Sequence, residues 1–391
     1  MFKRDMADRL KYFASKLPVV AILGPRQSGK TTLAKATFPK HTYISFEDID
    51  QRLFATDDPR RFLREYQNEH GLILDEIQHV PDLLSYIQTY VDQEKKNGYF
   101  ILTGSQNFLV TQTISQTLAG RMAVLTLLPL SLKELLENKL ITSYEQAIFY
   151  GGYPRIFEQG LLPNEWYPSY ILNYIERDVR QIMQLVDLGT FQRFIKLCAG
   201  RTGQILNVSA LATDAGINIQ TAKSWLSVLQ ASYIIVLLQP HFVNFSKRLI
   251  KSPKLYFLDT GIACSLLEIR SEQDLRNHYL RGGLFESMII NELYKQYYNQ
   301  GTQPGLYFWR DSHGHEMDCI IDRGARLIPI EIKAGETIDS SYFDGLEYWN
   351  ELAKSDPEQG YLIYGGKENQ SRSKGNVISW RAINKIVDKY P

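Results

Sequence analysis

A glycine-rich loop between an apolar run and a polar run constrains this chain more than any other feature of its sequence. Residues 24–32 read Gly-Pro-Arg-Gln-Ser-Gly-Lys-Thr-Thr and match the pattern GxxxxGK[ST]. The mostly apolar residues 18–23 precede the loop, so it lies where a buried strand gives way to a helix. Glycines at such a position allow backbone N–H groups and the helix N-terminus to face phosphate oxygens. The sequence therefore predicts a phosphate-binding loop on an α/β sheet.

The side chains of this loop predict its ligands. Lys30 would place a positive charge on the β- and γ-phosphates of a nucleotide, and the hydroxyl of Thr31 would bind Mg²⁺. The other residues expected to line the nucleotide are Gly24, Pro25, Arg26, Gln27, Ser28, Gly29 and Thr32. We therefore expect ATP and Mg²⁺ as the ligands of the loop.

An acidic pair follows a second apolar run. Asp75 and Glu76 come directly after residues 72–74, at the carboxyl edge where doubly wound sheets bind their ligands. Asp75 would hold Mg²⁺ through its water shell, and Glu76 would orient and deprotonate the attacking water. An exposed acidic turn is the simpler alternative. A complete P-loop in the same chain favours the catalytic interpretation.

Two further polar residues are candidates for the reaction itself. Residues 102–107 end the next expected strand. Among them, Ser105 is the favoured candidate for a polar contact that senses the γ-phosphate, and ordinary helix or turn capping is the alternative. Arg121 precedes the last expected strand and is a candidate arginine finger for the nucleotide of a neighbouring subunit. A surface arginine is the alternative. The arginine-finger hypothesis requires a homo-oligomer.

The pattern of apolar runs predicts four parts. Strands alternate with helical patterns in residues 1–130, which predicts a parallel sheet covered by helices on both faces. Residues 131–186 are expected to form a helical lid or connector. Residues 187–279 show the element order of a winged helix-turn-helix. Residues 280–391 are expected to form a separate small α/β domain.

Polar residues of the expected winged helix suggest DNA as a partner. The candidates for contacts in a DNA groove are Thr221, Lys223 and Ser224, and those for phosphate contacts are Lys247, Arg248 and Lys251. A winged helix can equally bind a protein, so both kinds of partner stay open. The net charge of +1 decides nothing, because a locally basic face can be compensated elsewhere.

An acidic cluster is expected in the C-terminal part. Glu286 lies in a helical pattern, Asp318 in a strand, and Glu331 and Lys333 two residues apart in the next strand, where they share a face. Two carboxylates at Asp318 and Glu331 can hold Mg²⁺ while a lysine activates water, which suggests a phosphodiesterase. The alternatives are an ordinary charged strand face and a fold that has kept its shape but serves as a docking module.

The motifs together resemble a known family, the prokaryotic AAA-type ATPases related to archaeal ATPases and to signal-transduction NTPases. The segments that carry the resemblance begin at Gly24 (GPRQSGKTTL), Leu74 (LDEIQ), Leu102 (LTGS), Leu118 (LAGR) and Leu128 (LPLS). The later segments GGYP, LDTGIA, WRD and EIKAG are similar to the C-terminal region that usually follows this ATPase. The resemblance implies an AAA-type ATPase in residues 1–130.

The cluster at Asp318, Glu331 and Lys333 is similar to the PD-(D/E)xK pattern of restriction-endonuclease-like nucleases, with Glu286 in the place of their supporting helix acid. Met317 stands where that pattern usually has proline. This second resemblance implies a nuclease-like domain in residues 280–391. His313 and His315 lie close to Asp318 in sequence, and we expect solvated histidines rather than metal ligands there.

Composition excludes several classes of protein. The three cysteines form no CxxC pair, which argues against disulfides and zinc and favours a cytoplasmic setting. No run of about 18 apolar residues is present, so we expect no membrane insertion. Arg177 and Asp178 are expected to form a surface ion pair, and contact with the nucleotide from the helical lid is the alternative. Two functions are therefore open: an ATPase coupled to DNA binding or cleavage, and a nucleotide-controlled switch whose C-terminal domain docks a partner.

Overall fold

The computed structural model describes residues 2–105, 117–176, 187–242 and 250–390. Contacts within it divide the chain into two units. The first unit comprises Met1–Leu130 and Tyr298–Thr302, and the second comprises Ser131–Tyr297 and Gln303–Pro391.

The first unit is built on a parallel sheet of five strands in the order β2-β3-β4-β1-β5. These strands are β1 (Val19–Leu23), β2 (Thr42–Ser45), β3 (Leu72–Asp75), β4 (Phe100–Gly104) and β5 (Met122–Thr126). Every residue of β1, β3 and β4 is buried, as expected of strands covered on both faces. The predicted α/β class with a parallel sheet is confirmed.

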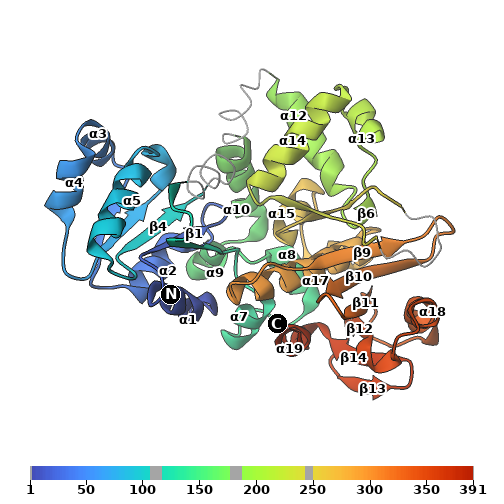
Figure 1. Ribbon diagram of the computed structural model, residues 1–391. Coiled ribbons are helices and arrows are strands. Elements are labelled where there is room, and N and C mark those ends of the chain that lie inside the picture. The colour runs from blue at the N-terminus through green and yellow to red at the C-terminus, as the bar shows by residue number, and fades with distance from the viewer. Residues whose placement is uncertain (1, 106–116, 177–186, 243–249, 391) are drawn as a thin grey trace. The chain divides into compact units, whose positions relative to one another are not determined.

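Helices cover the two faces of this sheet (Figure 1). They are α1 (Met6–Ala14), α2 (Lys30–Thr37), α3 (Ile49–Asp57), α4 (Pro59–Tyr66) and α5 (Leu83–Glu94). The alternation of side chains along β3 serves both cores: Leu72 and Leu74 pack with α3, α4 and α5, whereas Ile73 packs with α1 and α2. All five strands run the same way, so their carboxyl ends share one edge, and that edge carries the phosphate-binding loop.

The second unit begins with short helices and continues into a helical bundle with a small sheet. Its first helices are α7 (Leu132–Glu137), α8 (Tyr144–Tyr150), α9 (Pro154–Gln159) and α10 (Pro163–Tyr170), followed by a π-helical turn at Ile171–Glu176. The next elements are α12 (Leu188–Ala199), β6 (Gln204–Ile205), α13 (Val208–Ala215), α14 (Ile219–Ala231), β7 (Ile235–Leu238), β8 (Lys254–Phe257), α15 (Thr260–Leu266) and α16 (Glu272–Asn277).

Strands β6, β8 and β7 form an antiparallel sheet in that order. The helices α12, α13 and α14 and the strands β7 and β8 follow one another in the expected order, whereas β6, α15 and α16 were not expected from the sequence. Residues 243–249, which join β7 to β8 and would include a wing, lie outside the described residues. The assignment as a winged helix-turn-helix therefore stays a prediction.

The C-terminal part of the second unit holds a mixed sheet of six strands in the order β13-β14-β12-β11-β10-β9. Its elements are α17 (Arg281–Asn299), β9 (Leu306–Arg310), β10 (Glu316–Asp322), β11 (Leu327–Lys333), α18 (Asp344–Ala353), β12 (Tyr361–Tyr364), β13 (Gln370–Arg372), β14 (Gly375–Ser379) and α19 (Asn384–Lys389). A core with Trp309, Leu346 and Trp349 joins α18 to this sheet. The restriction-endonuclease-like assignment stays a prediction.

No helix among the described residues is long and apolar enough to cross a membrane.

Candidate functional site

The phosphate-binding loop leaves β1 through a glycine that no other residue could replace. Gly24 has φ 151°, and a Cβ there would overlap the carbonyl oxygen of Leu127. Gly29 has φ 94° and is the N-cap of α2. The two glycines let the loop curl against the next strand connection and then enter the helix. The helix N-terminus therefore points at the carboxyl edge of the sheet, where an anion is stabilised.

The Lys30 side chain curls into this loop. Its Nζ donates hydrogen bonds to the carbonyl oxygens of Gly24 at 3.1 Å and Pro25 at 2.8 Å. Burial lowers the pKa of Lys30, while the nearby carboxylates of Glu76 and Asp75 oppose that shift. The loop thus presents a desolvated ammonium group next to two carboxylates, as a phosphate-binding lysine requires.

Asp75 ends β3 beside the loop and collects three hydroxyl groups. Thr31 Oγ1 donates to Asp75 Oδ1 at 2.8 Å, and the Tyr43 hydroxyl donates to Oδ2 at 2.8 Å. Thr103 Oγ1, from β4, also donates to Oδ1. Burial and the Asp75 carboxylate raise the pKa of Tyr43 to about 12. The Thr31 hydroxyl and the Asp75 carboxylate are neighbouring oxygen ligands, and this donor set fits Mg²⁺.

Glu76 adopts a left-handed backbone conformation with φ 57° and is held by two polar side chains. Ser105 Oγ donates to Glu76 Oε2 at 2.7 Å, and Gln78 Nε2 contacts the same oxygen. Burial alone would raise the pKa of Glu76, but the Lys30 charge and the hydrogen bonds from Ser105 and Gln78 outweigh it and lower the pKa. Glu76 is therefore an oriented carboxylate. A contact of Ser105 with a γ-phosphate stays a prediction.

Arg121 lies away from this group. It precedes β5, so it sits at the amino edge of the parallel sheet, opposite the edge that carries Lys30. Its guanidinium forms a two-pronged ion pair with Asp92, with Nε–Oδ1 at 2.5 Å and Nη2–Oδ2 at 2.9 Å. Arg121 therefore does not join the nucleotide site of its own chain. The predicted role at a neighbouring subunit stays a prediction.

Four residues of this site were not among those predicted for it from the sequence: Arg4, Tyr43, Gln78 and Thr103. Arg4 is buried and donates to the carbonyl oxygens of Ser28 at 2.7 Å and Leu128 at 2.6 Å. It thereby ties the phosphate-binding loop to the segment after β5. Polar residues after an apolar strand can be found by the same rule that identified Asp75, and that rule would have identified Thr103.

The C-terminal acidic residues also come together. Lys333 Nζ contacts Glu331 and lies 3.9 Å from Asp318 Oδ2, which also accepts a hydrogen bond from the Ile332 amide at 2.9 Å. Glu286, on α17, approaches the same group. All four residues predicted from the sequence are therefore neighbours. Their catalytic and metal-binding roles were predicted and are not tested by this geometry.

A buried lysine that the sequence did not single out lies among them. Lys254 Nζ is 2.8 Å from Glu286 Oε1, also contacts Glu316, and lies 3.8 Å from Asp318 Oδ1. Burial, with the Asp318 charge, raises the pKa of Glu331 to about 8, although Lys333 opposes the shift. Burial likewise raises the pKa of Glu286 to about 7 against the effect of Lys254. The carboxylates form ion pairs with basic side chains of the same chain.

The remaining predicted residues are placed as follows. His313 and His315 are largely exposed, and His315 Nδ1 lies 3.1 Å from Asp311. Within the described ranges, no three or more histidine, cysteine or acidic side chains are grouped to hold a metal ion. On α14, Lys223 is exposed and both Thr221 and Ser224 are half-buried, while Lys251 is exposed before β8. The predicted residues outside the described part are Arg177, Asp178, Lys247 and Arg248.

The GGYP and LDTGIA segments meet at a buried carboxylate. Asp259 Oδ2 accepts from the Gly152 amide at 2.8 Å, and Oδ1 accepts from the Tyr167 hydroxyl at 2.7 Å and the Gly261 amide at 3.0 Å. A Cβ at Gly151 would overlap both Tyr167 and Asp259. These two segments therefore fasten α10 and α15 to the turn before α9.

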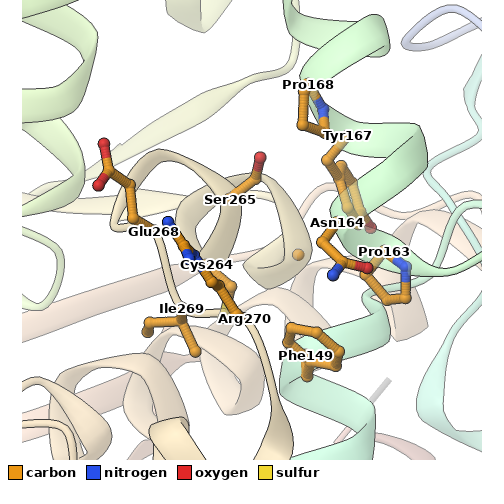
Figure 2. Close-up of a pocket in the computed structure, with 11 residues that line it drawn as sticks. Phe149, Pro163, Asn164, Tyr167, Pro168, Cys264, Ser265, Glu268, Ile269 and Arg270 are labelled. Atoms are coloured by element: carbon orange, nitrogen blue, oxygen red, sulfur yellow. The ribbon is translucent and has the colours of Figure 1, made fainter.

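A pocket of about 160 Å³ opens beside this fastening. Figure 2 shows Phe149, Pro163 and Tyr167 on one side and Cys264 and Ser265 on the other. Cys264 is buried at its edge, and burial raises the pKa of its thiol. The lining is mixed apolar and weakly polar, without a charged side chain buried in it.

The comparisons with known proteins agree with the geometry of the first unit. Residues 16–136 match the family model of the AAA domain. Residues 141–273 match a domain of unknown function, DUF8612, and residues 281–383 match another, DUF4143. The chain therefore carries an AAA domain followed by a C-terminal DUF4143 domain.

Its relatives include an uncharacterised protein of Mycobacterium tuberculosis, 29% identical over 341 residues that span 86% of this chain and 74% of that protein. An uncharacterised protein of Methanocaldococcus jannaschii is 23% identical over 371 residues, spanning 86% of this chain and 79% of that protein. Among solved structures, the Walker-type ATPase of Pyrococcus abyssi is 16% identical with a TM-score of 0.47, covering 68% of this chain and 96% of that one.

Proposed function

We propose that the first unit binds ATP with Mg²⁺ and hydrolyses it. The observation that carries this proposal is the 2.8 Å hydrogen bond between Thr31 and Asp75, which joins the two predicted magnesium ligands at the carboxyl edge of the sheet. Lys30 lies at the same edge of the sheet, and hydrogen bonds from Ser105 and Gln78 hold Glu76 next to it. The parts needed for phosphoryl transfer to water are thus within reach of one another.

Each side chain has a distinct task in this proposal. Lys30 leaves the loop carbonyls and binds the β- and γ-phosphates, which offer its ammonium group stronger acceptors. Bound through Thr31 and Asp75, Mg²⁺ would neutralise the negative charge that develops on the phosphate oxygens. Glu76 is ionised because its pKa is lowered, so it accepts a proton from the water that it orients. Ser105 and Gln78 hold the Glu76 carboxylate in its direction.

Phosphate release and nucleotide binding test the proposal when they are measured on the same preparations. We expect Lys30→Ala to lose both binding of a fluorescent ATP analogue and turnover. Glu76→Gln should retain binding and lose turnover, because its side chain still fits but no longer accepts a proton. Glu65→Gln is a matched control, since Glu65 is exposed on α4. Equal turnover by Glu76→Gln and wild type would remove Glu76 from its proposed role as the base.

We also propose that turnover is coupled to DNA through residues 187–279. Helix α14 buries Ala222, Trp225 and Leu226 and leaves Lys223 exposed, and Lys251 is exposed before β8. A helix with one buried face and an exposed face that carries Lys223 suits a DNA groove, with Lys251 on a phosphate. The rival is a switch in which the same surface binds a protein.

Duplex binding at several salt concentrations separates these two uses. We expect salt-dependent binding and a change in ATP turnover on adding DNA. Replacing Lys251, the predicted phosphate contact, by alanine should reduce the salt slope by about one, whereas Lys367→Ala, at an exposed position of the C-terminal domain, should leave it unchanged. Turnover that ignores DNA, with no salt-dependent binding, would favour the protein-docking alternative.

A further inference from the structure

The acidic cluster of the C-terminal domain contains more carboxylates than its sequence pattern suggested. Glu316 and Asp318 come from β10, Glu331 from β11 and Glu286 from α17. Their side chains are between 9% and 21% exposed, so water compensates little of their charge. Four carboxylates brought this close repel one another unless cations stand between them.

Lys254 supplies such a cation from a strand outside the C-terminal sheet. Its side chain is 3% exposed, and its Nζ contacts Glu286 and Glu316 and lies 3.8 Å from Asp318. A cation shared by three carboxylates holds the position that a divalent metal would need, because a metal must also touch several of these oxygens at once. The ammonium group and a metal ion therefore exclude each other.

The backbone holds Lys254 in this place. It opens β8, the central strand of the three-stranded sheet, and pairs with Ile205 of β6 on one side and Leu238 of β7 on the other. The Phe308 ring lies 5.7 Å from Nζ and adds a weak attraction for the cation. A strand hydrogen-bonded on both sides cannot withdraw without breaking its sheet. The backbone of Lys254 is thus fixed beside the cluster.

Other basic side chains complete the compensation. Lys333 contacts Glu331 and lies 3.9 Å from Asp318, and Arg310 Nη1 lies 2.7 Å from Glu316 Oε2. Three cations therefore face four carboxylates. The second oxygen of Glu331 lies near Gly345 of α18 and is buried. The described residues leave little negative charge for a metal ion to neutralise.

We propose that Lys254 takes the place of a divalent metal in this cluster, so that the C-terminal domain holds its carboxylates together without metal and is a non-catalytic module. Glu286, Asp318, Glu331 and Lys333 are then structural residues that join α17, β10 and β11 to β8. This proposal concerns the second unit alone, and it stands or falls independently of ATP hydrolysis.

Terbium luminescence tests the proposal directly, because Tb³⁺ binds carboxylate sites and is sensitised by nearby aromatic rings such as Tyr256. The wild type and Asp318→Asn should give the same emission, since any Tb³⁺ at the nucleotide site contributes equally to both. Lys254→Met should gain emission that the double variant with Asp318→Asn loses. Lys254→Arg keeps the charge and should behave as the wild type.

Two outcomes would overturn the proposal. One is a wild-type signal that Asp318→Asn abolishes, whether that signal is Tb³⁺ emission or Mn²⁺-dependent plasmid cleavage. The other is a Lys254→Met variant that is folded by circular dichroism yet gains no emission sensitive to Asp318→Asn. If Lys254→Met does not fold, the comparison of wild type with Asp318→Asn still decides, because neither protein changes Lys254.

Discussion

The guanidinium group of Arg4 donates a 2.7 Å hydrogen bond to the carbonyl oxygen of Ser28, inside the phosphate-binding loop. A second bond from the same group reaches Leu128. A residue that lies 24 positions before Ser28, outside every recognisable motif, thus sets where the loop backbone lies. The first prediction follows from this contact.

Replacing Arg4 by methionine should weaken ATP binding and destabilise the first unit. The variant leaves two carbonyl oxygens without their charged donor, which costs roughly 3 kcal/mol. We expect a raised KM for ATP, a smaller effect on kcat, and a lower Tm in a thermal melt. Lys3→Met changes the exposed neighbouring residue and should alter none of the three. An Arg4→Met variant with the KM of the wild type would show that the loop does not depend on Arg4.

The Thr31 hydroxyl should determine how much Mg²⁺ the protein needs. Thr31→Ala removes the group that bonds Asp75, so the Mg²⁺ concentration for half-maximal phosphate release should rise by about tenfold or more. Thr31→Ser keeps a hydroxyl at the same place and should remain close to the wild type. The measurement is a Mg²⁺ titration of turnover at saturating ATP. Equal titration curves for the alanine and serine variants would contradict a ligand role for the hydroxyl.

Arg121 can reach a nucleotide only in another subunit, since it lies at the amino edge of its own sheet. We expect Arg121→Ala to bind ATP normally and to turn it over slowly. Mixing it with Lys30→Ala should restore turnover, because one chain then supplies the intact nucleotide site and the other supplies the arginine. Light scattering on the mixture reports whether the chains assemble. A mixture no more active than the sum of its two components would end the arginine-finger hypothesis.

The raised pKa of Glu331 predicts a pH-dependent stability difference. A carboxyl group whose pKa rises on folding, here from 4.5 to about 8, favours the folded state while it is protonated, and this contribution is lost as the pH rises toward 8. Glu331→Gln imitates the protonated form. The free energy of unfolding of the variant should equal that of the wild type at about pH 5. At about pH 9 it should be higher, by about 1.4 kcal/mol for each unit by which folding raises the Glu331 pKa.

Urea unfolding at both pH values measures that difference. Glu351→Gln, at an exposed position on α18, controls for the loss of one negative charge and should show no such trend. A stability gap between Glu331→Gln and the wild type that stays constant from acid to alkaline pH would argue that Glu331 keeps its ordinary pKa.

The nucleotide site could be predicted because most of its functional groups belong to short runs of consecutive residues. The loop at Lys30 and the pair at Asp75 each lie directly after an apolar strand, and parallel strands end at one edge. Arg4 and Tyr43 could not be found in this way, because they reach the site from other elements through contacts between residues distant in sequence.

The C-terminal cluster shows the same limit more sharply. Its acids could be gathered from their spacing along two strands, but the cation among them comes from β8, which the sequence places in another domain. The edge strand β13 and its neighbour β14 were also not expected, because residues 370–379 are mostly polar and lack an apolar pattern.

The central position of β8 also has a mechanical consequence. The first residue of β8, Lys254, lies among the acids of α17 and β10. Separating the three-stranded sheet from them would leave an ammonium group and three carboxylates unpaired in a poorly hydrated interior. Residues 187–257 and the six-stranded sheet should therefore move as one rigid lever. A movement of α14 caused by a bound partner would therefore be accompanied by the same movement of the six-stranded sheet, because this junction does not act as a hinge.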